Sequence, residues 1–217
     1  MAGLKTLTRV REAEPTWEIA ELFPTQGNWS EEEYLALPGN RLLEFANGFL
    51  EVLPMPTTSH QELVAYLYGL FLAFVSQHDL GELLFAPIRV RLWRGKFREP
   101  DLVFMLKSHA RRIGEEFWDG ADLVLEVLST DPKDRRRDLV IKRREYARAR
   151  IPEYWIVDPQ ERTITVLRLA GTRYVVHGCY AGGSQATSQL LTGLDIDVSG
   201  TFAQIDAVRR LTRKTRR

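Results

Sequence analysis

The stretch DLVLEVLS (residues 122–129) has the apolar pattern of a strand buried in a sheet, yet it carries Glu126 in its middle. A second such run, EPDLVFML (residues 99–106), has Asp101 directly after Pro100. Because proline lacks an amide donor and keeps the preceding residue extended, we expect Asp101 to begin a strand near an edge or end of a sheet. A lone ionised carboxylate buried at Glu126 would cost several kcal/mol. The strand therefore predicts a basic partner, backbone donors or a cation beside this glutamate.

A hairpin upstream adds a third acid. The Asn-Gly dipeptide at 47–48 is a strong signal for a type I′ turn, in which both turn residues have positive φ, and this turn pairs Glu44 with Glu51. Like charges directly opposite each other are unfavourable. Two interpretations remain open: both glutamates point into water, or at least Glu44 joins Asp101 and Glu126 around a hard cation. Oxygen-only ligands suit Mg²⁺ or Mn²⁺.

The segment from Lys133 to Arg150 has a helical pattern. The face that carries most of its apolar residues holds Leu139, Lys142, Tyr146 and Ala149, whereas another face holds Arg137, Arg144 and Arg148. A lysine on the apolar face can extend its ammonium to water, pair with Asp138 one turn earlier, or reach the carboxylates of the strands. The pattern alone does not choose among these three arrangements.

The other segments predict an α/β protein. Ser30 and Glu33 form a capping box for a short helix, and a longer amphipathic helix with its cap near Thr58 or Ser59 follows. ELLFAPIRVRLW, EYWIVD and ITVLRL read as strands. This order predicts a mixed sheet flanked by helices, of the α/β or α+β class. We expect one domain over residues 29–206, an N-terminal arm over 1–28 and a basic C-terminal tail over 207–217.

Composition narrows the function less than the motifs do. The 217 residues carry a net charge of only +1, so basic patches are local: one lies within 135–150 and the other within 209–217. Cys179 is the only cysteine, which excludes an intramolecular disulfide and a cysteine-based metal site and suits a reducing cytoplasm. No run is long and apolar enough to span a membrane, and no GxxxxGK phosphate loop is present.

Four motifs in order resemble the Uma-two family of proposed endonucleases, within the PD-(D/E)XK restriction-endonuclease-like superfamily. They are LLEFANGFLEVLPMPTTSHQELV, EPDLVF, DLVLEVLSTD and DLVIKRREYARARIPEYWIVDP, and the resemblance covers roughly residues 30–200. It implies a central mixed sheet between helices, with the acids at one end of the sheet. It also implies that Asp101 and Glu126 are the motif acids and that Glu44 is an additional acid.

Two positions depart from the family and superfamily patterns. The superfamily lysine stands two residues after the glutamate, where this chain has Leu128. The family resemblance points instead to Lys142 on the following helix. Arg150 occupies a position after that helix where relatives have glycine, so we expect the helix to end differently here.

These observations lead to the hypothesis of a metal-dependent endonuclease acting on DNA. Asp101, Glu126 and Glu44 would bind Mg²⁺ or Mn²⁺, Lys142 would orient water or stabilise phosphate charge, and the arginines of the helix would hold the DNA backbone. His60 either approaches a carboxylate of the site or only makes local hydrogen bonds. The alternatives are a catalytically inactive nuclease-fold module that binds nucleic acid or protein, and a glycosidase with paired carboxylates. RNA, branched or damaged substrates and a homodimer are compatible with the sequence, which favours none of them.

Overall fold

The computed structural model describes residues 25–37 and 42–214, with side chains up to residue 207. The predicted N-terminal arm therefore lies mostly outside the described residues. So do the side chains of nearly all of the predicted C-terminal tail, although the backbone of the last helix, α6 (Val198–Lys214), continues into that tail.

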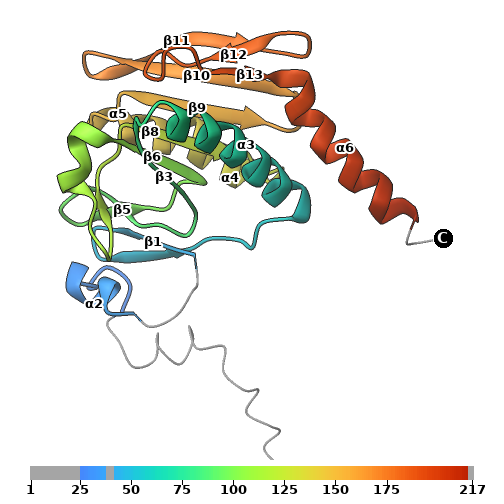
Figure 1. Ribbon diagram of the computed structural model, residues 1–217. Coiled ribbons are helices and arrows are strands. Elements are labelled where there is room, and N and C mark those ends of the chain that lie inside the picture. Colours follow the sequence, from blue (N-terminus) through green and yellow to red (C-terminus); the bar gives the residue numbers. More distant parts are fainter. Residues whose placement is uncertain (1–24, 38–41, 215–217) are drawn as a thin grey trace, which may run out of the picture.

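A mixed six-stranded sheet forms the centre of the molecule (Figure 1). Its strands run in the order β11-β10-β9-β8-β6-β3, and the bounds are β3 (Gly81–Phe85), β6 (Leu102–Leu106), β8 (Leu123–Val127), β9 (Glu153–Asp158), β10 (Thr163–Ala170) and β11 (Arg173–Tyr180). The central pair β8 and β9 is parallel, and the other neighbouring pairs are antiparallel. The parallel pair is joined through the helices that follow β8, as a parallel connection requires.

A second, five-stranded sheet has the order β2-β1-β5-β4-β7. Its strands are β1 (Leu43–Ala46), β2 (Phe49–Val52), β4 (Val90–Trp93), β5 (Lys96–Arg98) and β7 (Trp118–Asp119). The short helix α2 (Glu31–Leu35) packs beside it, with the capping box of Ser30 and Glu33 in place. In Figure 1 this part lies opposite the end that carries β10, β11 and the small sheet of β12 (Gln185–Thr187) and β13 (Asp195–Asp197).

Both faces of the six-stranded sheet are covered, which accounts for the apolar character of its central strands. Alternate residues of one face, including Leu125 and Trp155, pack with the long helix α3 (Thr58–Gln77) and with α6. The other face, including Val124 and Tyr154, packs with the helix α5 (Arg143–Arg148) and with β4. The predicted mixed sheet flanked by helices is confirmed. Glu126 belongs to the second face, two residues after Val124, so it points toward the helix that carries Lys142.

The β1–β2 hairpin has the predicted register. Glu44 pairs with Glu51, and the turn residues Asn47 and Gly48 have φ values of 50° and 84°. Gly27 lies against the turn, and its backbone N–H donates to the Gly48 carbonyl over 2.7 Å. A Cβ added at position 48 would lie 2.3 Å from the Gly27 carbonyl oxygen. The turn therefore needs glycine both for its backbone conformation and for this close approach.

We expect Gly48→Ala to lower the free energy of unfolding by roughly 1–3 kcal/mol, because a side chain would be strained in the left-handed region and would clash with Gly27. Urea titration followed by circular dichroism measures this change. Gly171→Ala is the matched control, since Gly171 also has a positive φ, 62°, but an added Cβ meets nothing within 4 Å. Equal losses in the two variants would contradict the close-approach argument.

The helical segment after β8 differs from the prediction in its register. It consists of α4 (Pro132–Arg136), the π-helical segment η2 (Arg137–Lys142) and α5. The wide π turn buries Asp138 and Lys142 and leaves Leu139, predicted on the apolar face, 36% exposed. The hydroxyl of Tyr154 donates to the Asp138 carbonyl over 3.1 Å, which explains how the wider turn is accommodated. The expectation for Leu139 is wrong because a helix of 3.6 residues per turn was assumed.

The end of this helix is also different from the expectation. Arg150 adopts a φ of 63°, the left-handed conformation that glycine favours after a helix. Its guanidinium donates to the Gly171 carbonyl over 2.7 Å. The helix therefore ends in the conformation typical of glycine even though the residue is arginine, and the expectation of a different ending is wrong.

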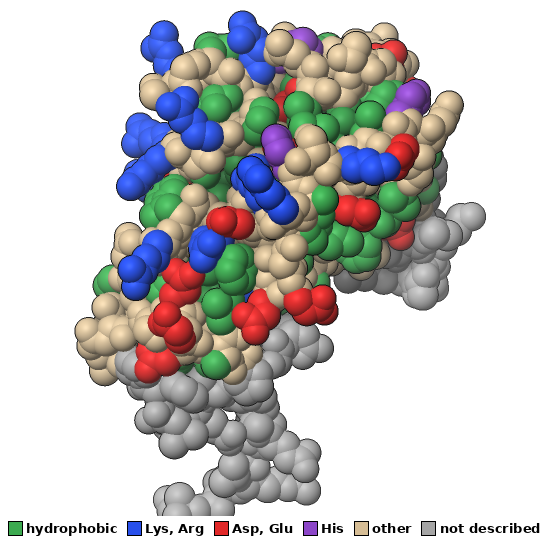
Figure 2. Space-filling model, turned by 60° about the vertical axis from the view of Figure 1, so that its left-hand side comes forward, with side chains coloured by type: hydrophobic (Ala, Val, Ile, Leu, Met, Phe, Trp, Pro, Cys, Tyr) green, Lys and Arg blue, Asp and Glu red, His purple; other side chains and the backbone are tan. Residues whose placement is uncertain are grey.

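Charge is unevenly distributed over the surface despite the small net charge. Figure 2 shows one face on which Lys and Arg side chains gather toward one upper corner, whereas most Asp and Glu side chains in view lie lower. Such segregation produces local electrostatic patches that a net charge of +1 conceals. Within residues 25–37 and 42–214, no helix is long and apolar enough to cross a membrane.

Candidate active site

The ladder between β6 and β8 brings the two motif acids together. Leu102 pairs with Leu125 in antiparallel register, so one step beyond the ladder Asp101 lies opposite Glu126. The backbone N–H of Val127 donates to Oδ2 of Asp101 over 2.7 Å, which fixes the carboxylate against β8. Asp101 remains 17% exposed in its side chain, and Glu126 is buried, at 4% exposure. Two acids separated by 25 positions of sequence thus form a cross-strand pair at the end of the central strands.

Glu126 has the basic partner that its burial requires. Lys142 Nζ lies 2.8 Å from Glu126 Oε1, and the hydroxyl of Tyr146 donates to the same oxygen over 2.6 Å. Lys142 also lies 3.5 Å from Asp138 Oδ1, so two of the arrangements left open by the sequence occur together. Burial raises the pKa of Glu126 to about 8 despite the neighbouring ammonium, and Asp138 and Asp101 add to the rise. A cation that binds near Glu126 would therefore be stabilised by this carboxyl group.

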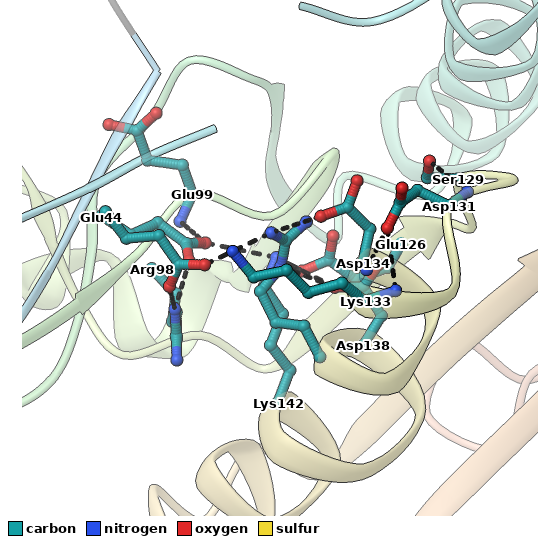
Figure 3. Close-up of polar contacts among 12 residues, drawn as sticks. Glu44, Arg98, Glu99, Glu126, Ser129, Asp131, Lys133, Asp134, Asp138 and Lys142 are labelled. Atoms are coloured by element: carbon teal, nitrogen blue, oxygen red, sulfur yellow. Dashed lines mark hydrogen bonds and ion pairs between the residues drawn. The ribbon is translucent and has the colours of Figure 1, made fainter. Parts of the chain in front are cut away.

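Glu44 is buried rather than solvated. Its Oε1 lies 3.2 Å from Lys142 Nζ and accepts the backbone N–H of Glu99, and its Oε2 is bonded to the Arg98 guanidinium. Burial alone would raise the pKa of Glu44, but Lys142 and Arg98 hold it at about 2. Figure 3 shows Glu44 and Glu126 on either side of the Lys142 ammonium. The interpretation that both hairpin glutamates point into water is wrong for Glu44, because it compensates two buried cations.

His60 approaches the site from the first turn of α3. Its Nε2 lies 3.2 Å from Asp101 Oδ2, and its backbone N–H donates to the side chain of Thr57, which caps the helix. The cap is one residue before the predicted position. Burial lowers the pKa of His60, but the hydrogen bond and charge of Asp101 outweigh burial and raise it above its ordinary value. His60 therefore contacts a carboxylate of the site, which was the first of the two interpretations of this residue.

A cavity of about 500 Å³ opens beside these residues. Asp101, Glu126, Lys142 and His60 line it, whereas Glu44 does not. Arg137 also lines it, and its guanidinium lies 2.9 Å from Asp134 Oδ1 and 3.5 Å from carboxylate oxygens of Glu51 and Asp138. The arrangement brings the two motif acids, three further acids (Glu99, Asp134 and Asp138), an ammonium, an imidazole and a guanidinium around one recess.

Besides Asp134, which lines the cavity, sequence reasoning missed two charged residues that directly precede the Pro-Asp motif, Arg98 and Glu99. Arg98 is 3% exposed and bridges Glu44 and Glu145, with its Nε 2.7 Å from Glu145 Oε2. Glu99 also lines the cavity, and burial together with Glu44 raises its pKa to about 8. Its carboxylate points away from Lys142 (Figure 3), and its Oε2 is buried without a hydrogen-bond partner. The only signal in the sequence was their position directly before the Pro-Asp motif.

The donor set fits a divalent cation held by two carboxylates. The hydrogen bonds to Asp101 and Glu126 use one oxygen of each, so Asp101 Oδ1 and Glu126 Oε2 accept none from the described residues. Mg²⁺ is commonly bound by one or two carboxylates, with water and substrate phosphate completing its octahedron. No group of three or more His, Cys, Asp or Glu side chains in the described part of the chain could hold a metal ion. The site therefore suits an ion that takes two ligands from the protein and its remaining ligands from water and substrate.

Comparisons with known proteins bear on the family and the fold of the chain. The model of a family named Uma2 and described as "Putative restriction endonuclease" matches residues 31–199. Among solved structures, the chain is similar to one described as a putative nuclease belonging to DUF820 from Anabaena variabilis, with a TM-score of 0.67 and 17% identity over 82% of this chain and 99% of that chain. At this identity the likeness shows the fold. No curated protein matches the chain.

Proposed function

Because the chain belongs to the Uma2 family over residues 31–199, we propose that it is a divalent-metal-dependent endonuclease that hydrolyses phosphodiester bonds in DNA. The family resemblance inferred from the sequence motifs is confirmed. The observation that carries the proposal is the pairing of Asp101 with Glu126 across adjacent strands, each with one carboxylate oxygen free of protein hydrogen bonds. Both side chains line the same cavity.

The side chains around the cavity have distinct tasks in this proposal. A Mg²⁺ or Mn²⁺ ion held by Asp101 and Glu126 would supply an activated water and offset charge on the phosphate. Lys142 and Tyr146 fix the orientation of Glu126 through its Oε1, and Val127 and His60 fix Asp101 through its Oδ2. Preorganised groups of this kind need no rearrangement when charge develops in the transition state.

Glu44 and Lys142 receive roles that differ from the first hypothesis, whereas Arg137 keeps the phosphate-binding role expected of the helix arginines. Glu44 is bonded to Lys142 and Arg98 and does not line the cavity, so we assign it the positioning of Lys142 rather than metal binding. Arg137 lines the cavity with its side chain 12% exposed, and its guanidinium suits a phosphate oxygen. Arg137 thus belongs to the site itself, whereas Arg144 and Arg148 are exposed on the helix surface.

One observation favours the second candidate function, an inactive nuclease-fold module. The side chain of Lys142 is 2% exposed and its ammonium lies within 3.5 Å of three carboxylates, so it is held by the protein and not directed at a substrate. A module that had lost activity could keep such a lysine for stability alone. The two functions differ in whether the chain cleaves DNA at all when the divalent ion is supplied.

We expect the full chain to nick or linearise plasmid DNA with Mn²⁺ or Mg²⁺ and to lose this activity when EDTA is added, because the carboxylate pair acts only through a bound cation. Gel analysis over a time course measures the rate, and excess Mn²⁺ added after EDTA should restore it. Calorimetric titration with Mn²⁺ provides an independent readout. Cleavage that persists in EDTA would contradict the metal-dependent mechanism, and metal binding without cleavage would favour the inactive module.

A further inference from the structure

Much of the cavity wall has no use in binding a phosphate or a metal ion. Apolar side chains line it beside the acids: Met55, Val64, Pro87, Leu128, Pro159 and Ile205. These residues come from six separate segments of the chain. Val64 lies on α3 and Ile205 on α6, and the other four follow directly or closely after β2, β3, β8 and β9. Phosphate and hydrated cations gain nothing from such surface, because burying apolar area favours only apolar groups. The wall therefore indicates a ligand with an apolar portion beside its phosphate.

A nucleoside unit has the required composition. Its base presents an apolar face that packs against apolar side chains and a polar edge that hydrogen-bonds. Polar side chains that could meet such an edge, Ser59, Gln61 and Thr130, line the same cavity. A volume of about 500 Å³ lies in the range of sites that enclose a small ligand. The cavity thus accommodates one nucleotide together with its phosphate.

The depth of the acids limits how that nucleotide can arrive. Glu126 is 4% exposed, so a scissile phosphate must enter the cavity to approach it, and its sugar and base must follow. A base that is still paired would bring the opposite strand with it. A base that is unpaired, or flipped out of the helix at some energetic cost, enters alone.

We propose, on the basis of the endonuclease function proposed above, that this cavity takes an unpaired nucleotide, so that the substrate class is single-stranded DNA or duplex DNA with an unpaired base. The apolar wall packs on the base while Asp101 and Glu126 face its phosphate. Met55 and Pro87 are the exposed members of this wall. Met55 is 86% exposed, and its flexible side chain suits packing against any of the four bases.

The test compares three oligonucleotides of one sequence: single-stranded, fully paired, and paired with a one-nucleotide bulge. Cleavage by the full chain is measured with Mn²⁺, and binding is measured by fluorescence anisotropy with Ca²⁺ in place of Mn²⁺. We expect the single strand and the bulge to be cut at least about tenfold faster than the paired duplex, because a paired base must first leave its partner and the stack at an energetic cost. We expect the same order in binding.

The variant Met55→Ala tests whether the preference for unpaired nucleotides depends on this apolar wall. We expect it to weaken single-strand binding about three- to tenfold and to leave binding of paired duplex within twofold, since it removes packing on an unpaired base. Val176→Ala is the matched control, because Val176 is 56% exposed on β11 and does not line the cavity. Thermal melts establish that both variants fold.

The outcomes separate this proposal from the endonuclease function. Paired duplex cut and bound as well as the single strand would overturn the unpaired-nucleotide site and leave the nuclease proposal standing. A single-strand preference that Met55→Ala does not change would overturn the assignment to the cavity. If no DNA is cut but Met55-dependent binding of single strands persists, the nucleotide site stands and the endonuclease proposal fails.

Discussion

Glu126→Gln and Asp101→Asn should each reduce metal-dependent DNA cleavage by on the order of 10³-fold, because each removes a charge that stabilises the bound cation and through it the transition state. Both amides keep the shape of the carboxyl and can still accept the existing hydrogen bonds from Lys142, Tyr146 or Val127. The loss should therefore appear in the rate and in Mn²⁺ affinity while the fold is retained. Plasmid cleavage and calorimetric Mn²⁺ titration measure the two effects.

Glu116→Gln is the matched control for this pair of variants. Glu116 is exposed on the segment between η1 (Lys107–Arg112) and β7, and it does not line the cavity. We expect its activity to remain within twofold of the wild-type chain, because isolated surface substitutions change little. If Glu126→Gln cleaved DNA as fast as Glu116→Gln, Glu126 would not be a metal ligand of this reaction.

The parts of the fold that follow local rules could be predicted from the sequence. Asn47-Gly48 fixed the hairpin register because few dipeptides accept two positive φ values, and Ser30 with Glu33 fixed the start of α2 through two reciprocal hydrogen bonds. Alternating and continuous apolar runs indicated most of the strands. The run over residues 82–93, interpreted as one strand, is instead divided between β3 and β4 of different sheets. These signals act within a few residues, so no knowledge of the rest of the chain was needed.

The arrangement of the site depended on contacts that no local pattern records. Arg98 binds Glu44 and Glu145, which lie 54 and 47 positions away in the sequence. The π turn before α5 is stabilised by Tyr154 from a later strand, so the segment 137–142 alone could not reveal it. The motifs indicated which acids to consider, but their burial and their partners are properties of the assembled sheets.

Charges of alternating sign connect the two sheets through this site. Glu145 accepts from Lys96 and from Arg98 of β5, and the sequence of contacts continues through Glu44 and Lys142 to Glu126 on β8. Buried ion pairs of this kind contribute little net stability as a set, but the loss of one member leaves an uncompensated charge. Removal of Lys142 should destabilise the protein most, since its ammonium is shared by Glu126, Glu44 and Asp138.

We therefore expect Lys142→Met to lower the free energy of unfolding by about 3–5 kcal/mol, the range for removing one partner of a buried pair. For a chain of 217 residues this corresponds to a fall in Tm of roughly 6–20 °C. Lys133→Met is the control, because Lys133 is exposed on α4, and it should change stability by no more than about 0.5 kcal/mol. Thermal and urea unfolding followed by circular dichroism measure both variants.

A second substitution distinguishes lost charge compensation from lost packing. Adding Glu126→Gln to Lys142→Met replaces the carboxyl group that lost its ammonium partner, and with it the cost of protonating that group or of keeping its charge buried. The double variant should therefore be about 1–3 kcal/mol more stable than the two single losses would give by addition. A methionine that merely packed badly would show no such recovery, because the amide does not alter its volume. Strict additivity would therefore mean that Lys142 does not stabilise the protein through Glu126, and that its contribution comes from its ion pairs with Glu44 and Asp138 or from its alkyl chain. In that case the ammonium would be no part of the structural reason why a carboxylate can lie within β8.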